Sequence, residues 1–169
     1  MRKKLSIFFF LFTITFATGC SFNQVQTNLN SENNSELPKT ELISLDNKPI
    51  KLSNYQNQKN LVLIFSATWC HACVQELIDV QKYYNYADKN KLEIIWIDNN
   101  EEENVVKDFR NQHQLTFSIA FDHQNKFYHQ YEVTTLPTTV FLDQQGKTQA
   151  IKVGALTETE LANQVGKLF

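Results

Sequence analysis

Several ingredients of common binding sites are scarce in this sequence. Glycine occurs only 4 times in 169 residues, and no glycine-rich segment of the kind that wraps a phosphate is present. The basic residues form no stripe and do not alternate with aromatic residues, so binding to nucleic acid or nucleotides has no support. His71, His113, His123 and His129 show no metal-ligand spacing, and no flavin or nicotinamide site is visible. We therefore expect neither a metal nor a cofactor.

Long apolar runs are also lacking, apart from one near the N-terminus. The run at 5–18 is rich in Phe, follows the basic residues 2–4, and is too short to span a bilayer comfortably. It ends in small residues, and Ala-Thr-Gly-Cys at 17–20 resembles the bacterial lipobox, whose cysteine is lipidated. We expect a lipoprotein signal peptide over 1–19 and a lipid on Cys20. This anchor would hold the protein on a bacterial membrane with its domain outside the cytoplasm, in the periplasm or on the outer face of the cell membrane. Ordinary signal cleavage, or an uncleaved anchor with Cys20 as a spare thiol, are the alternatives.

The chain that follows the signal divides into a polar segment and a domain. Residues 20–38 are rich in Asn and cannot bury enough apolar surface to fold alone, so they predict a flexible tether. Its reach is on the order of 25 Å. Residues 39–169 have room for one domain with a sizeable core. Without the signal, the chain carries 13 basic and 18 acidic residues, a net charge of −5.

The two remaining cysteines, Cys70 and Cys73, stand at the most informative place in the sequence. They follow an apolar run at 61–65 and precede a helical pattern from Val74 to about Ala87. A strand that ends in Cys-x-x-Cys and opens a helix puts a thiol at the helix N-terminus, where unpaired N–H groups and the macrodipole favour a thiolate. A purely structural disulfide is less favoured, because so short a loop would constrain the unfolded chain little. A metal pair would need further ligands.

Apolar runs and helical patterns alternate along the domain in the order βαβαβαββα. This order predicts an α/β fold with helices on both faces of a sheet, preceded by a short strand, a turn and a second short strand. The acidic residues 101–103 are interpreted as a solvated helix start, and Thr157 with Glu160 as a capping box. The expected strands are 40–45, 49–52, 61–67, 92–97, 117–121, 138–142 and 147–153, and the expected helices are 74–87, 101–113, 125–131 and one that begins after 157.

A second fragment, Val-Thr-Thr-Leu-Pro-Thr-Thr-Val-Phe at 133–141, places Pro137 directly before a strand. Proline is tolerated there because the first residue of a strand need not donate to the ladder. A cis bond would turn the backbone of Leu136 toward a neighbouring site. Taken by itself the sequence predicts a trans bond, since cis is the minority state.

Together the two fragments resemble the thioredoxin fold, and the details are closer to its membrane-tethered TlpA/ResA-like branch. The resemblance extends from about residue 38 to the end of the chain. It implies a thioredoxin-like three-layer α/β/α fold with a central mixed β-sheet and an N-terminal β-hairpin extension, and the activity of a thiol:disulfide oxidoreductase. The matching residues are Phe-Ser-Ala-Thr-Trp-Cys at 65–70, Glu76, the helix at 101–113, Tyr131, Val133, Pro-Thr-Thr at 137–139, Asp143 and Gly146.

The resemblance also implies roles for individual residues. Cys70 is the exposed nucleophile and Cys73 the deeper cysteine that resolves the mixed disulfide, so the pair forms a redox-active disulfide. Pro137 is the family's cis-proline beside the dithiol, and Leu136 offers backbone groups to an incoming peptide. Glu76 influences the protonation of the cysteines, or alternatively only suits the helix dipole.

Further positions tune this pattern or depart from it. Trp69 borders the nucleophile, or alternatively packs only in the core. His71, if protonated, favours the thiolate and makes the couple more oxidising, or else faces solvent with little effect. Ala72 occupies a place where the family often has Pro, and Ile64 one where cytosolic thioredoxins have a buried Asp. Ser66 replaces an aromatic residue, which would enlarge or wet the groove.

By the same resemblance we expect a monomer that reduces disulfides of exported proteins and serves cell redox homeostasis. Its clients would be apocytochrome c, during cytochrome c maturation, a methionine sulfoxide reductase, or similar proteins. Electrons would arrive from a membrane thiol carrier of the DsbD/CcdA type. The alternatives are a thiol oxidase that donates disulfides and a copper-binding metallochaperone on the same fold, although such chaperones usually space their cysteines by three residues.

Overall fold

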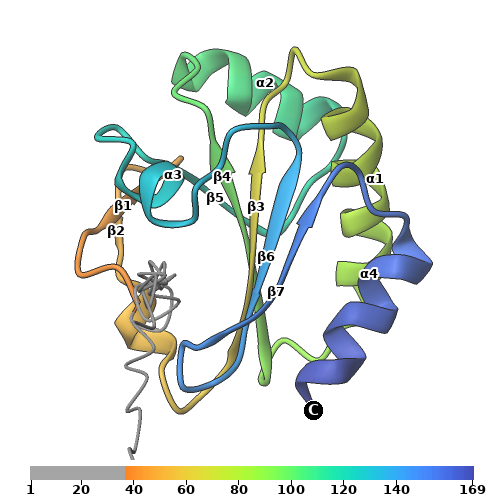
Figure 1. Cartoon of the computed structure of the whole chain (residues 1–169). Helices are drawn as coiled ribbons and strands as arrows, with labels where there is room; N and C mark the ends of the chain where they lie inside the picture. The colour runs from red at the N-terminus through yellow and green to blue at the C-terminus, as the bar shows by residue number, and fades with distance from the viewer. Residues whose placement is uncertain (1–36) are drawn as a thin grey trace, which may run out of the picture.

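The computed structural model describes residues 37–169. The predicted signal peptide, Cys20 and the tether up to residue 36 lie outside the described residues. Over 37–169 the elements follow the predicted order, with one 3-10 turn added after the N-terminal hairpin and another after the last helix (Figure 1). The strands are β1 (Leu42–Ser44), β2 (Pro49–Ile50), β3 (Asn60–Ser66), β4 (Leu92–Asp98), β5 (Ser118–Phe121), β6 (Thr138–Leu142) and β7 (Thr148–Val153). The helices are η2 (Leu52–Tyr55), α1 (His71–Tyr86), α2 (Glu103–Gln112), α3 (Lys126–Gln130), α4 (Glu158–Val165) and η3 (Gly166–Leu168).

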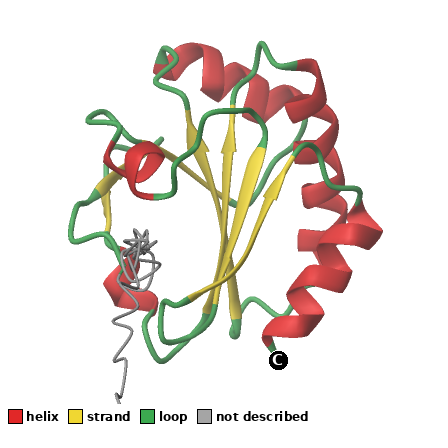
Figure 2. Ribbon diagram, viewed as in Figure 1, coloured by secondary structure: helices red, strands yellow, loops and turns green. Residues whose placement is uncertain are grey.

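The described strands form one mixed sheet in the order β2-β1-β5-β4-β3-β6-β7. Strand β3 runs parallel to β4, and β4 parallel to β5, whereas β6 is antiparallel to β3 and β7 antiparallel to β6. The sheet lies between two layers, with α1 and α4 on one side and α3 on the other (Figure 2). This is the expected three-layer α/β/α arrangement with an N-terminal hairpin.

Strand β3 shows why the sheet needs cover on both faces. All seven of its residues are buried. Val62 and Ile64 pack in one apolar cluster with side chains of α1, α2 and α4, and the alternate residues Leu61, Leu63 and Phe65 pack in a second cluster with η2 and α3. Because side chains alternate between faces, a continuous apolar run is stable only when both faces are covered.

Helix α1 begins at His71, three residues before the predicted start. Cys70 is its N-cap, and the Cys70 sulfur accepts a hydrogen bond from the backbone N–H of Cys73 at 3.3 Å. The helix buries Cys73, Glu76, Leu77 and Val80, at the three- and four-residue spacing of one helix face. Cys70 therefore lies between the end of β3 and the first turn of α1.

Helix α4 has the predicted capping box. The Thr157 side chain accepts from the backbone N–H of Glu160, and the Glu160 carboxylate accepts from the backbone N–H of Thr157. Within residues 37–169, no helix has the length and apolar content that a membrane crossing requires.

Candidate active site

The two cysteines lie at the N-terminus of α1 and are joined by a disulfide, with their Cα atoms 5.2 Å apart. Cys73 is fully buried, whereas Cys70 is half-buried. The N–H of Cys73 points at the Cys70 sulfur, which is the contact that a helix N-terminus offers to an anion. Cys70 is therefore the more accessible of the two cysteines, and its role as the attacked sulfur stays a prediction.

A cavity of about 340 Å³ opens beside Cys70. Trp69 forms one border and is 66% exposed, so the alternative that Trp69 packs only in the core is wrong. The opposite border is the segment that leads into β6. The lining residues are Trp69, Cys70, Asn99, Tyr128, Val133, Thr134, Thr135 and Leu136.

The peptide bond between Leu136 and Pro137 is cis, as the family resemblance implied. The sequence taken by itself predicted a trans bond, and that prediction is wrong. Pro137 is buried directly before β6, and its carbonyl accepts the backbone N–H of Gly154 at 2.9 Å. Since Leu136 lines the same cavity as Cys70, the structure brings the two predicted fragments together. His71 is exposed and does not line this cavity.

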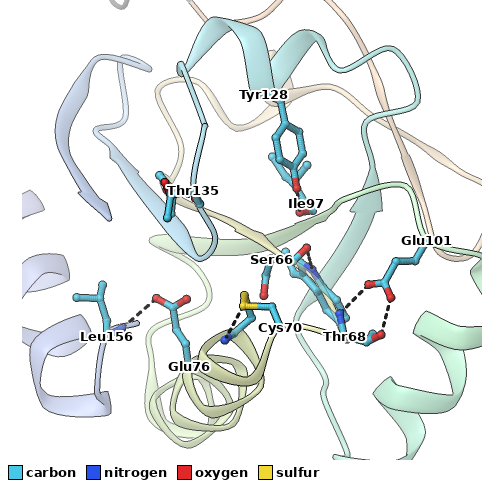
Figure 3. The surroundings of a disulfide bond; sticks show 12 residues. Ser66, Thr68, Cys70, Glu76, Ile97, Glu101, Tyr128, Thr135 and Leu156 are labelled. Carbon is cyan, nitrogen blue, oxygen red and sulfur yellow. Dashed lines mark hydrogen bonds between the residues drawn. A yellow bond between two sulfur atoms is a disulfide. The ribbon is translucent and has the colours of Figure 1, made fainter. Parts of the chain in front are cut away.

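Glu76 is a buried acid one helical turn beyond Cys73. Its Oε1 atom accepts a hydrogen bond from the Thr139 hydroxyl at 2.9 Å. The same atom accepts a second one from the backbone N–H of Leu156 at 3.3 Å (Figure 3). Its Oε2 atom is buried and has no hydrogen-bond partner among the described residues. Burial raises the pKa of Glu76 to about 7, against the two hydrogen bonds, which lower it. A carboxyl group beside the deeper cysteine can thus gain or lose a proton near neutral pH.

One prediction about the acidic segment is wrong. Helix α2 begins at Glu103, and Glu102 and Glu103 are exposed as expected, but Glu101 is not part of a solvated helix start. Its two carboxylate oxygens accept the backbone N–H of Thr68 at 2.6 Å and the Thr68 hydroxyl at 2.5 Å (Figure 3). The physical reason is topological: β4 runs parallel to β3, so the residues after β4 meet the loop after β3.

Sequence reasoning also missed Asp98, the last residue of β4. It is fully buried, and its Oδ1 accepts the backbone N–H of Glu101 at 2.7 Å. Burial, and to a smaller extent the neighbouring Glu101 side chain, raise the pKa of Asp98 to about 8, although backbone hydrogen bonds from Glu101 and Asn99 lower it. The available signal was an acidic residue at the end of a predicted buried strand. A charged side chain at such a position needs a partner, because burial of an unpaired charge is costly.

Ser66 lies elsewhere than predicted. It is fully buried and does not line the cavity, so it neither enlarges nor wets the groove. Its carbonyl accepts the Trp96 indole N–H at 3.2 Å. Ser66 stands directly opposite Asp98 in the β3–β4 register, and its hydroxyl has no partner among the described residues.

Metal binding finds no support in the described part of the chain. No group of three or more His, Cys, Asp or Glu side chains within residues 37–169 could hold an ion. A four-coordinate zinc site at Cys70 and Cys73 would need further ligands, which the residues 37–169 do not supply.

Comparisons with known proteins agree with this geometry. The model of the AhpC/TSA family matches residues 34–151. The thiol-disulfide oxidoreductase ResA of a Bacillus cereus strain is 32% identical over 133 residues, which cover 79% of this chain and 76% of that protein.

Two solved structures show the same fold. The crystal structure of StoA from Bacillus subtilis superposes with a TM-score of 0.65 at 25% identity and covers 75% of this chain and 95% of that one. The pneumococcal exposed lipoprotein thioredoxin Etrx1 from Streptococcus pneumoniae gives a TM-score of 0.63 at 25% identity, over 76% of this chain and 98% of that one. The chain belongs to the AhpC/TSA family of thioredoxin-fold proteins, and it is a thiol-disulfide oxidoreductase of the ResA and StoA type with a Cys-x-x-Cys pair at Cys70 and Cys73.

Proposed function

We propose that this oxidoreductase works as a reductant: it transfers two electrons from its dithiol to disulfides of exported client proteins. One observation carries the exchange mechanism, namely the pairing of a half-buried Cys70 with a fully buried Cys73 that has an acid of near-neutral pKa one turn away. This asymmetry provides one sulfur for attack, one for release, and a group that accepts the proton of the second. The reducing direction is taken from the resemblance to the TlpA/ResA-like branch.

The first step is an attack by Cys70. In the reduced protein the Cys70 thiolate attacks one sulfur of the client disulfide, the client S–S bond breaks, and the other client sulfur leaves as a thiolate. The backbone N–H of Cys73 and the α1 dipole stabilise the Cys70 thiolate before the attack. The product is a mixed disulfide between Cys70 and the client.

The second step is resolution by Cys73. Glu76, when ionised, takes the Cys73 thiol proton directly or through water, and the resulting thiolate attacks the Cys70 sulfur. The mixed disulfide breaks, the second client sulfur leaves as a thiolate, and the protein is left with the Cys70–Cys73 disulfide seen in the structure. The client has then gained the two electrons, and a donor dithiol must reduce the protein again.

The cavity between Trp69 and the segment at 133–136 is the proposed client site. An extended client peptide would lie along this segment, with main-chain pairing to Leu136 next to the cis-proline Pro137. The exposed Trp69 ring offers apolar contact on the other side of Cys70. Main-chain hydrogen bonds and a single apolar contact surface do not depend on a particular client sequence. Such low sequence specificity suits a protein that reduces several clients.

We also propose that the protein acts outside the cytoplasm, tethered to the membrane by a lipid on Cys20. The lipobox-like sequence at 17–20 supports this proposal, and so does the similarity to a thioredoxin described as an exposed lipoprotein. Apocytochrome c or a methionine sulfoxide reductase would then be the clients, and a membrane thiol carrier of the DsbD/CcdA type would be the electron donor.

The equilibrium potential of the Cys70–Cys73 couple tests the direction of electron flow. A value of about −270 mV, as for thioredoxin, agrees with a reductant, whereas a value of about −120 mV, as for DsbA, would show an oxidase. Insulin reduction with dithiothreitol as donor tests the activity, and Cys70→Ser is the control that should abolish it. Palmitate labelling of the expressed chain, with Cys20→Ser as its control, tests the tether.

A further inference from the structure

We propose that Glu101 is a positioning residue of the exchange reaction, which clamps the segment carrying Trp69 and Cys70, and that Asp98 keeps this clamp closed by holding the one proton of the acidic pair. Neither residue belongs to the dithiol, to the cis-proline segment or to the proposed proton acceptor Glu76. The inference rests on the exchange activity of the dithiol, but its geometric part can be tested without any client.

The clamp consists of two hydrogen bonds to one residue. Glu101 Oε2 accepts the backbone N–H of Thr68 at 2.6 Å, and Oε1 accepts the Thr68 hydroxyl at 2.5 Å. Thr68 lies in the short segment between the end of β3 and the start of α1, directly before Trp69. A carboxylate that binds a backbone N–H and a hydroxyl together fixes both the position and the direction of the chain there.

The position of Thr68 decides the position of the reacting groups. Trp69 and Cys70 are the next two residues, and both line the cavity in which the client would lie. Trp69 is 66% exposed and has little packing of its own to hold it. Exchange requires three sulfur atoms close to one line, so freedom in this segment would lower the rate of attack.

Asp98 holds the backbone of Glu101 in place through a hydrogen bond. It is fully buried at the end of β4, and its Oδ1 holds the backbone N–H of Glu101 at 2.7 Å. Its Oδ2 is buried without a partner among the described residues, and so is the hydroxyl of Ser66, its neighbour in the register. A proton turns the Asp98 carboxyl group into a donor, and its interaction with the neighbouring Glu101 carboxylate favours this protonated form.

The charges around Asp98 favour a neutral form for it. The titratable groups that face it are Glu101, from the loop after β4, and the Tyr128 hydroxyl of α3, which in turn faces Asp122. No cation is among them, so a second negative charge beside Glu101 would be repelled in a buried site. Asp98 therefore stays neutral, and no second negative charge arises beside the Glu101 carboxylate, until the pH rises past the raised pKa of Asp98. Above that pH the two carboxylates repel each other, and the clamp loosens.

Amide hydrogen exchange of the oxidised protein, measured by NMR, tests the geometry. Glu101→Ala should lower the protection of the Thr68 N–H by about tenfold or more, the range expected for loss of a hydrogen bond to a charged group. Glu102→Ala, which removes an exposed carboxylate one position away, is the matched control and should leave that protection within about twofold. Protection of the β3 amide of Leu63 shows whether each variant is folded.

The pH dependence tests the shared proton. Asp98→Asn keeps an oxygen for the Glu101 N–H but cannot ionise. In the wild-type protein the protection factor of Thr68, corrected for intrinsic exchange, should fall between pH 7 and 9, whereas in Asp98→Asn it should stay constant. An equal fall in both proteins would overturn the role of Asp98.

Kinetics tests the link to the reaction. The reduced Glu101→Ala variant should attack a disulfide-linked model peptide about tenfold more slowly than wild type at pH 7, with an unchanged pH profile of Cys70 alkylation. An unchanged rate of attack, or unchanged Thr68 protection in this variant, would overturn the clamp. If the wild-type protein does not exchange disulfides at all, the proposed function fails, while the hydrogen-exchange result still decides the geometry.

Discussion

Glu76 makes a quantitative prediction about stability as a function of pH. Its folded-state pKa is about 7, compared with 4.5 for an ordinary glutamate. Because the folded state binds this proton more tightly than the unfolded state does, the free energy of unfolding must fall as the pH rises from about 4.5 to 7 and then level off. The difference between the two pKa values corresponds to about 3 kcal/mol.

Glu76→Gln removes this dependence while it keeps the hydrogen bonds. The glutamine carbonyl can still accept from the Thr139 hydroxyl and the Leu156 N–H, as Oε1 does now. At pH 4.5 or below, the variant and the wild type should be about equally stable. At pH 8 and above, the oxidised variant should be more stable than the oxidised wild type by up to about 3 kcal/mol.

Urea unfolding of the oxidised proteins at pH 4.5, 6, 7 and 8.5 measures the effect. With an m-value of about 2 kcal/mol per M, the two midpoints should separate by about 1.5 M above pH 8. Glu103→Gln, at an exposed acid in α2, is the control and should follow the wild type at every pH. A gap between Glu76→Gln and wild type that stays constant from pH 4.5 to 8.5 would refute the reasoning, because a titrating carboxyl group could not be its source.

Three further predictions follow from the same geometry. In Cys73→Ser the mixed disulfide between Cys70 and the client should persist, since no second sulfur can release it, and non-reducing electrophoresis should show a client adduct that Cys70→Ser does not form. Trp69→Ala should raise KM for a disulfide peptide about fivefold with little change in melting temperature, because this ring is exposed beside the cavity and contributes little to the core; an unchanged KM would remove Trp69 from the client site. Thr157→Ala should lower the free energy of unfolding by about 1 kcal/mol through loss of the α4 capping box, measured by urea unfolding, without an effect on insulin reduction.

Much of the fold could be predicted from periodicity alone. The uninterrupted apolar run of β3 required cover on both faces, and the alternation of strands and helices then left few topologies. Thr157 and Glu160 marked the start of α4 correctly, because a capping box is a local interaction. Helix α1 begins earlier than predicted because Cys70 itself is the cap, and a cysteine is not among the usual capping residues.

The site was predictable where chemistry is encoded in short motifs, and not where it depends on the meeting of distant segments. The spacing of Cys70, Cys73 and Glu76 predicts their place at the start of one helix, whereas their roles were implied by the family resemblance. The cis bond at Pro137 followed only from the family resemblance, since the local sequence favours trans. Glu101 was misread because its acidic neighbours suggested a solvated helix start, and its true partner Thr68 is 33 residues away in the sequence.

The pH dependence of Cys70 alkylation in the reduced protein, followed at that residue by mass spectrometry, tests the central claim most directly. The helix N-terminus and the Cys73 N–H should stabilise the thiolate, so the rate should reach half its maximum well below about pH 8.5, the pKa of a free cysteine. A midpoint at or above that value would contradict the assignment of Cys70 as the activated nucleophile.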